Sequence, residues 1–299
     1  RAWGSSSCCD DAGVSIALVL AILAGAPLAL HAIWRARYGY PPDHIPRVLC
    51  FHKLSRRFLF EGTWTTPERF AAYIDRLRAR GYSFIDESQY LAALDAPPED
   101  RTKQIFLTFD DGYTEVHDIA WPLLSDRNIP FHVFLVTDFA GRPNTWDLSL
   151  GRRPFRHLDW AAVREMAAGV TFGSHTASHA DVTRMSRGDA RANFERSRKA
   201  IEDAVGKPVR TLSYPYGRYH AVAQEAARAA GFEAAFSLYP SHRNAIIDRF
   251  ALRRDAVYII DPVSMIETKL QQHALYGLEE MKCRAINAVA VLTPLLKAR

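Results

Sequence analysis

The sequence predicts an α/β protein: a distorted (β/α)7-type barrel, closed or nearly closed, preceded by one N-terminal transmembrane helix. Two observations support this prediction. Short apolar runs alternate with helix-like runs from residue 46 onward, and strands joined by helices of this length pair in parallel. Six or seven such units in about 230 residues favour a barrel. Before them, residues 12–34 contain no Asp, Glu, Lys or Arg.

Four parts follow from this pattern. We expect an N-terminal segment with the anchor at 1–34, a Pro-rich linker at 35–45, the barrel domain at 46–275 and a helical tail at 276–299. The apolar stretch 285–296 in the tail is too short to span a bilayer, so we expect it to dock on the domain or lie on a surface.

Residues 12–34 are long enough to cross a membrane. At ~1.5 Å per residue, this segment exceeds the ~30 Å hydrocarbon core. A cleaved signal peptide is the alternative, since Ala24-Gly25-Ala26 resembles a cleavage site. Asp10 and Asp11 before the segment, together with Pro27 after the site, favour an uncleaved anchor. Arg35 and Arg37 follow the segment while only Arg1 precedes it, so the positive-inside rule predicts a cytoplasmic domain.

Composition argues against several classes of protein. With 48% hydrophobic and 24% charged residues among 299, the chain is neither disordered nor a protein of many membrane spans. Its net charge of +5 is small and diffuse, which argues against nucleic-acid binding. The four cysteines contain no CxxC pair, so thiolate zinc sites and thioredoxin-like chemistry are not indicated.

The elements of the barrel are predicted in order along the chain. The clearest helix start is Thr65-Thr66-Pro67-Glu68, which offers an N-cap, a proline at the first helical position and a capping-box glutamate, and Gly81 follows that helix. We expect further helices at 88–94, 115–125, 159–168, 187–205 and 220–230. The predicted strands are 48–51, 83–85, 104–109, 131–136, 170–173, 211–214, 233–237 and 248–252.

Two polar motifs follow predicted strands and together suggest a metal site. Asp110-Asp111-Gly112 follows the strand 104–109, and His175 and His179 follow the strand 170–173. Alone, each motif is as well explained by a turn. Together they offer one carboxylate and two imidazoles to a divalent cation, with a position left open for water and a second carboxylate free to act as a base.

Two more motifs follow other strands at the same predicted rim. Tyr214-Pro215-Tyr216-Gly217 is a turn that could aim a backbone N–H at an oxyanion and present aromatic faces to a sugar ring. Phe51-His52 ends the first strand. The remaining candidates are Leu158-Asp159-Trp160 and Leu252-Arg253-Arg254.

These motifs give the sequence a family resemblance. Thr-Phe-Asp-Asp-Gly, Ser-His-Thr-x-x-His and Tyr-Pro-Tyr-Gly, in this order, resemble the NodB-type polysaccharide deacetylases, carbohydrate esterase family 4, over roughly residues 46–261. Phe51-His52 near the start is similar to the circularly permuted branch that contains the poly-N-acetylglucosamine deacetylases. The resemblance implies a barrel of the NodB homology kind.

The resemblance also implies roles for individual residues. Asp110 would be the general base and His52 the general acid. Asp111, His175 and His179 would hold the metal. The part of the site around the substrate would contain four further residues: Tyr216, whose backbone N–H would help hold the oxyanion, Pro215, Trp160 and Arg254.

One position departs from the family pattern. The third motif usually begins with an arginine that buttresses the catalytic aspartate, and Ser213 stands there in this chain. Arg254, which follows the late strand, is our candidate for the replacement.

The implied activity is metal-dependent hydrolysis of N-acetyl groups on amino sugars of an N-acetylglucosamine-type polysaccharide, with release of acetate. The ligand set suits one Zn²⁺, and Co²⁺, Ni²⁺ and Fe²⁺ share such ligands. Two alternatives stay open: an O-acetyl esterase or other C–N hydrolase using the same site, and a membrane-tethered glycan-binding protein without turnover. The expected partners are an acetylated polymer and the membrane, and no nucleic acid. The implied substrate would place the domain outside the cytoplasm, against the charge bias around residues 12–34.

Overall fold

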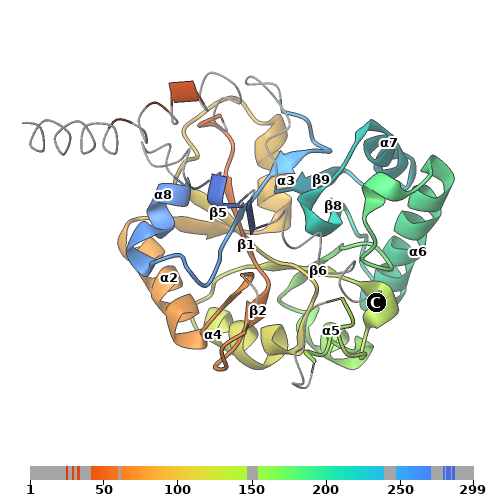
Figure 1. Ribbon diagram of the computed structural model, residues 1–299, viewed down its shortest axis with the longest axis horizontal. Coiled ribbons are helices and arrows are strands. Elements are labelled where there is room, and N and C mark those ends of the chain that lie inside the picture. The colour runs from red at the N-terminus through yellow and green to blue at the C-terminus, as the bar shows by residue number, and fades with distance from the viewer. Residues whose placement is uncertain are drawn as a thin grey trace, which may run out of the picture.

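The computed structural model describes residues 42–59, 62–146, 154–238 and 247–270, together with residues 25, 29, 32–33, 279, 281–283 and 285–286. Parallel strands form the centre of this part and helices cover them, as the ribbon view shows (Figure 1). The expected alternation of strands and helices is therefore confirmed.

The strands form one large sheet and a small one. The small sheet pairs β2 (Lys53–Leu54) with β3 (Trp64–Thr65). The large sheet consists of β1 (Arg47–Phe51), β4 (Ser83–Ile85), β5 (Gln104–Phe109), β6 (His132–Leu135), β7 (Thr171–Ser174), β8 (Thr211–Ser213), β9 (Ala234–Ser237), β10 (Leu252–Arg253) and β11 (Asp255–Ala256).

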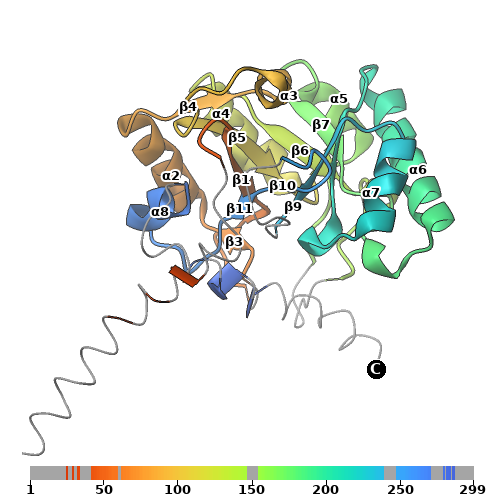
Figure 2. The same cartoon turned by 90° about the horizontal axis from the view of Figure 1, so that it is seen from above.

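The helices alternate with these strands. The α-helices are α2 (Pro67–Ala79), α3 (Glu87–Asp95), α4 (Trp121–Ser125), α5 (Trp160–Met166), α6 (Arg187–Val205), α7 (Ala221–Ala229) and α8 (Ile266–Leu270). Shorter helical segments are η1 (Val116–Ala120), η2 (Thr137–Phe139), η3 (Val182–Arg184), η4 (Pro215–Gly217) and η5 (Val263–Met265). In the view from above, α6 and α7 lie together on one side of the sheet, and α2 and α8 on the other (Figure 2).

The sheet closes on itself through residues 252–257. Its order is β10-β9-β8-β7-β6-β5-β1-β11, with β4 beside β5, and every pair is parallel. β10 pairs with β9, and β11, two residues later, pairs with β1 at the opposite end of this order. Between them, the backbone N–H of Arg254 donates to Ser237 O at 2.9 Å. A nearly closed parallel barrel results, as predicted.

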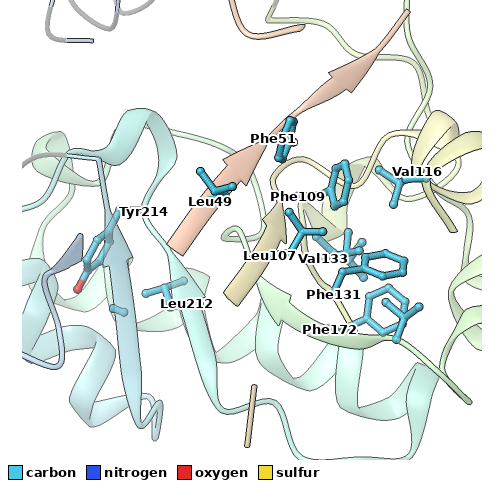
Figure 3. Close-up of a cluster of buried hydrophobic side chains, with 14 of the residues drawn as sticks. Leu49, Phe51, Leu107, Phe109, Val116, Phe131, Val133, Phe172, Leu212 and Tyr214 are labelled. Atoms are coloured by element: carbon cyan, nitrogen blue, oxygen red, sulfur yellow. The ribbon is translucent and has the colours of Figure 1, made fainter. Parts of the chain in front are cut away.

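Alternation along β5 sorts its side chains between two apolar clusters. Ile105, Leu107 and Phe109 pack in the cluster shared with the outer helices, part of which is drawn in Figure 3. Phe106 belongs to a second cluster with Phe134 of β6, inside the barrel. Because side chains alternate between the faces of a strand, position 110 continues the inward-facing series.

Helix α3 closes one end of the barrel interior. Tyr90 stacks on Phe106 with ring centroids 5.0 Å apart, and Phe236 lies 5.5 Å from the same tyrosine ring. Both rings in contact with Tyr90 are fully buried. The motifs that follow β5 and β7 lie at the other end of the barrel, where the strands end.

Three sequence predictions need correction. Thr66 caps α2 by accepting from the N–H of Arg69, and Pro67 opens the helix as predicted, but Glu68 is the second helical residue and not the third, so it falls outside a capping box and lies 3.5 Å from Arg56 instead. The single helix expected at 115–125 is a π-helical turn followed by α4, and Pro122 at this junction has no N–H to donate.

The late strand is also shifted. We expected it at 248–252, but the strands start at Leu252, because Asp248 accepts from the backbone N–H of Phe250 and forms a turn there. The strands at 83–85 and 104–109 and the helix at 187–205 have the expected ends, and the other predicted boundaries differ by one or two residues.

No helix in the part of the chain that the structure describes is long and apolar enough to cross a membrane. The anchor predicted at 12–34 lies almost entirely outside the described residues, as does most of the apolar tail stretch 285–296. Both stay predictions.

Replacing Asp86 by alanine should lower the stability of the domain. Asp86 caps α3 by accepting from Gln89 N at 2.8 Å, while the Gln89 side chain accepts from Asp86 N at 3.0 Å. Losing such a cap typically costs about 1 kcal/mol, so thermal unfolding should shift down by roughly 2–4 °C. Asp86→Asn, which keeps an N-cap acceptor, is the control, and equal melting of both variants would contradict the role of the cap.

Candidate active site

The strand-end motifs meet at one rim of the barrel. Asp110 and Asp111 follow β5, while His175 and His179 follow β7. His52 follows β1, which pairs with β5 in register from Arg47 to Phe51. The structure thus brings the residues predicted from separate motifs into one buried cluster.

Asp111, His175 and His179 form a set of three possible metal ligands. Asp111 Oδ1 lies 3.5 Å from His175 Nε2 and 3.3 Å from His179 Nε2, and the three ligand atoms are all within 4.8 Å of one another. Among the described residues, Asp111 Oδ1 has no hydrogen-bond partner although it is buried. A buried carboxylate oxygen facing two imidazole nitrogens fits a divalent cation.

The protonation of this set also fits a cation. His175 Nδ1 donates to Ser213 O at 2.8 Å, which leaves Nε2 with a lone pair directed at Asp111. Burial lowers the pKa of His175 to about 4, so the ring is neutral at pH 7. Burial would raise the pKa of Asp111, but His179 beside it holds that pKa well below its ordinary value.

Backbone strain is concentrated in the same place. Four non-glycine residues at the site have φ in the left-handed region: Asp111 at 69°, Thr176 at 68°, His179 at 55° and Tyr216 at 58°. Elsewhere in the described residues, Asn128 alone shares this feature. Such conformations cost of order 1–3 kcal/mol each and persist where the surrounding structure imposes them.

Asp110 is held by Arg254. The guanidinium donates from Nη1 to Oδ1 at 2.6 Å and from Nη2 to Oδ2 at 2.7 Å, a bidentate pair. Ser213 Oγ lies 3.3 Å from Asp110 Oδ2 and accepts from Arg254 Nη2 at 2.7 Å. The arginine missing at position 213 is thus supplied from position 254.

This pair fixes the charge of Asp110. Burial would raise the pKa of the carboxyl group, but Arg254 and then His175 outweigh it and hold the pKa below its ordinary value. Arg254 itself is fully buried, with a side-chain exposure of 0%. It positions the Asp110 carboxylate, as expected of the replacement for the family's arginine, and its grouping with residues around the substrate stays a prediction.

His52 lies on the other side of Asp110. Its Nε2 is 4.0 Å from Asp110 Oδ2. Burial lowers the pKa of the imidazole, and the two carboxylates raise it only in part. Cys50 Sγ lies 3.9 Å from His52 Nδ1. The sequence did not indicate this neighbour, because Cys50 belongs to an ordinary apolar strand.

The Tyr-Pro-Tyr-Gly turn lies beside the histidines. The Tyr216 ring meets the His179 ring edge-on at 4.9 Å. Gly217 has φ of 64°, and a Cβ there would lie 2.6 Å from Leu238 N, so only glycine fits. Pro215 is buried in the same turn.

Three aromatic side chains lie near the rim, and the sequence indicated Trp160 but not Trp146 or His157. Trp160 opens α5 and lines a small cavity together with Asp111. Trp146 and His157, which belong to no motif, also lie there: Trp146 stacks on the His179 ring, and His157 Nδ1 donates to Asp111 O at 2.8 Å. Only the fold of the segment between β6 and α5 brings them to the site.

Comparisons with known proteins agree with this geometry. Residues 98–235 match the model of the polysaccharide deacetylase family. The chain contains a polysaccharide deacetylase domain. This confirms the resemblance inferred from the motifs.

Two curated proteins are similar in sequence to this chain. YxkH of Bacillus subtilis is 23% identical over 215 residues, 71% of each chain. The poly-beta-1,6-N-acetyl-D-glucosamine N-deacetylase of Staphylococcus epidermidis is 25% identical over 209 residues, 64% of this chain and 68% of that protein.

Solved structures show the same fold. The Streptococcus pyogenes deacetylase PplD superposes with a TM-score of 0.62 at 18% identity, covering 76% of this chain and 98% of that one. IcaB from Ammonifex degensii gives a TM-score of 0.61 at 24% identity, covering 79% and 98%. The position of His52 at the end of the first strand is consistent with the circularly permuted branch.

Arg254→Met should destabilise the domain strongly. Removing one partner of a buried ion pair leaves the other uncompensated, which costs about 3–5 kcal/mol. The measurement is the free energy of unfolding in denaturant. Because the pKa of Asp110 is lower in the folded chain, the pair's contribution exists above the unfolded pKa of ~3.9 and fades as pH falls below it. A difference between wild type and variant that is the same at pH 7 and at pH 3 would contradict this account.

His175→Ala should abolish tight binding of a divalent cation, because one of three ligand atoms is lost. Metal content after dialysis measures the effect. The matched control is His117→Ala, whose ring pairs with Asp118 and Glu165 at the surface and should leave metal content unchanged. Equal metal content in wild type and His175→Ala would rule out the assigned ligand set.

Proposed function

We propose that the domain is a metal-dependent hydrolase that removes N-acetyl groups from N-acetylglucosamine-type units of a polysaccharide and releases acetate. The observation that carries this proposal is the division of labour between adjacent carboxylates. Asp111 faces two imidazoles, whereas Asp110 is held by Arg254 and lies 3.9 Å from His175 Nε2. The name of the staphylococcal relative supports the substrate class.

Asp111, His175 and His179 are the residues that would hold the metal. A divalent cation bound by them supplies Lewis-acid polarisation of the acetyl carbonyl and makes bound water more acidic. Its identity is left to measurement, with Zn²⁺ as the first candidate and Co²⁺, Ni²⁺ and Fe²⁺ as the others.

Asp110 is the proposed general base. Its low pKa keeps it ionised at neutral pH, and the arginine behind it fixes both oxygens in place, so it can accept the proton of the attacking water. The ion pair also keeps Asp110 from turning toward the metal ligands.

His52 is the proposed general acid. It lies next to Asp110, where its Nε2 can deliver a proton to the departing amine nitrogen. Tyr216 would contribute its backbone N–H to the oxyanion, in a turn whose left-handed φ of 58° sets the direction of that group. Pro215 and Trp160 complete the proposed surroundings of the sugar.

The proposal of a glycan-binding protein without turnover loses its sequence support. Its basis was Ser213 in the place of the family's arginine, and Arg254 makes the expected contact with Asp110.

We further propose that residues 12–34 anchor the domain at the outer side of the membrane, where a polymeric substrate would be found. Digestion of intact cells by an added protease tests this, since a cytoplasmic domain would be protected.

Asp110→Asn should lose turnover while it keeps its metal. Amide for carboxylate preserves shape but removes the proton acceptor, and loss of a general base typically costs about 10²–10⁴ in rate. Acetate release from N-acetylglucosamine oligomers and metal content are measured in parallel, with and without a chelator.

Acetylated xylan serves as the comparison substrate. Release of acetate from xylan alone would identify an O-acetyl esterase and overturn the N-deacetylase proposal. Wild-type rates in Asp110→Asn would show that another group is the base.

A further inference from the structure

We propose that Trp146 positions the metal-ligating ring of His179 by stacking flat against it. The inference deepens the proposed function: it rests on the metal site and is independent of which bond the enzyme cleaves. Trp146 belongs to none of the motifs that identify the site.

The two histidines of the site are supported differently. His175 has the usual arrangement, in which the nitrogen away from the metal donates to a carbonyl, here Ser213 O at 2.8 Å. His179 Nδ1 is buried and has no hydrogen-bond partner among the residues that the structure describes. The His179 ring therefore lacks the contact that normally fixes a metal-ligating imidazole.

The indole of Trp146 provides a different kind of support. Its ring centroid lies 4.2 Å from that of His179, with an angle of 11° between the planes. Tyr216 and His175 meet the same imidazole edge-on, at 4.9 and 5.0 Å. The flat contact with Trp146 restricts tilting of the ring in the direction that these edge contacts leave open.

Trp146 is itself held by two neighbours. Phe139 meets the indole at 4.8 Å with planes at 84°, and His157 lies 5.1 Å from it. His157 stacks in turn on Tyr113 at 4.8 Å. Phe139, Trp146 and His157 of this aromatic group come from the chain between β6 and α5, and Tyr113 comes from the turn that follows β5.

The same group also supports the carboxylate ligand. His157 donates from Nδ1 to the backbone oxygen of Asp111 at 2.8 Å, next to the left-handed φ of 69° that aims this residue. One aromatic group therefore touches two of the three ligands, Asp111 through a hydrogen bond and His179 through stacking. A residue that only filled space would not need the parallel geometry at His179.

The test compares metal affinity in full-length variants. Losing a contact that orients a metal ligand typically weakens binding about 10- to 100-fold. Trp146→Ala should show this loss for Zn²⁺ in competition with a chromophoric chelator, and Trp146→Phe, which keeps a flat ring, should recover most of it. Trp121→Ala is the matched control, because Trp121 lies 5.2 Å from His117, a histidine outside the site.

Tryptophan fluorescence complements the measured affinities in the folded protein. Ni²⁺ quenches indole fluorescence at short range, so its binding should quench the emission of the wild-type protein. The quenching should be weaker in Trp146→Phe and as strong as in the wild type in Trp121→Phe. Equal Zn²⁺ affinity in wild type and Trp146→Ala, or equal quenching in wild type and Trp146→Phe, would overturn the proposal.

The outcomes separate this inference from the proposed function. If Trp146→Ala loses metal affinity as expected but the wild-type protein releases no acetate, the positioning role is supported and deacetylation is contradicted. If the wild-type protein releases acetate but Trp146→Ala binds Zn²⁺ as tightly as the wild type, deacetylation is supported and the positioning role is contradicted. A wild-type chain that binds no divalent cation overturns both.

Discussion

The buried ion pair between Asp110 and Arg254 is the interaction on which the site depends. Inside the barrel an unpaired carboxyl would take up a proton, and a neutral Asp110 could not accept one from water. Arg254 reaches Asp110 because residues 252–257 join β9 to β1 and close the sheet. Closure of the barrel and ionisation of Asp110 therefore have one structural cause.

Two neighbouring carboxylates can serve different purposes because the backbone separates them. Asp110 continues the inward series of β5, while Asp111 leaves the strand with φ of 69° and turns to the histidines. Without that change of direction both side chains would compete for one cation or for one arginine. The conformational strain at Asp111 is offset by its hydrogen bond from His157 and, when a metal is bound, by ligation.

Local chemistry made much of the fold predictable. The helix at 187–205 was placed correctly because Ser186 caps it and Gly206 ends it in the left-handed conformation, both readable from residue type. The late strand was misplaced because Asp248 forms a turn that an apolar pattern does not reveal. The π-helical turn before Pro122 was missed for a similar reason. The spacing of apolar residues does not show which backbone carbonyl accepts the hydrogen bond of each N–H.

The sequence by itself indicated the family resemblance, three candidate metal ligands and the adjacent carboxylate, because each motif is a short run of residues that directly follows one strand. The sequence named Arg254 as the candidate partner of Asp110, and only the tertiary structure showed the bidentate contact between them, together with the contacts of Trp146 with His179 and of His157 with Asp111. These contacts join segments far apart in the chain, and their geometry depends on how the sheet closes and how the segment between β6 and α5 packs. No local pattern of residues encodes such distances.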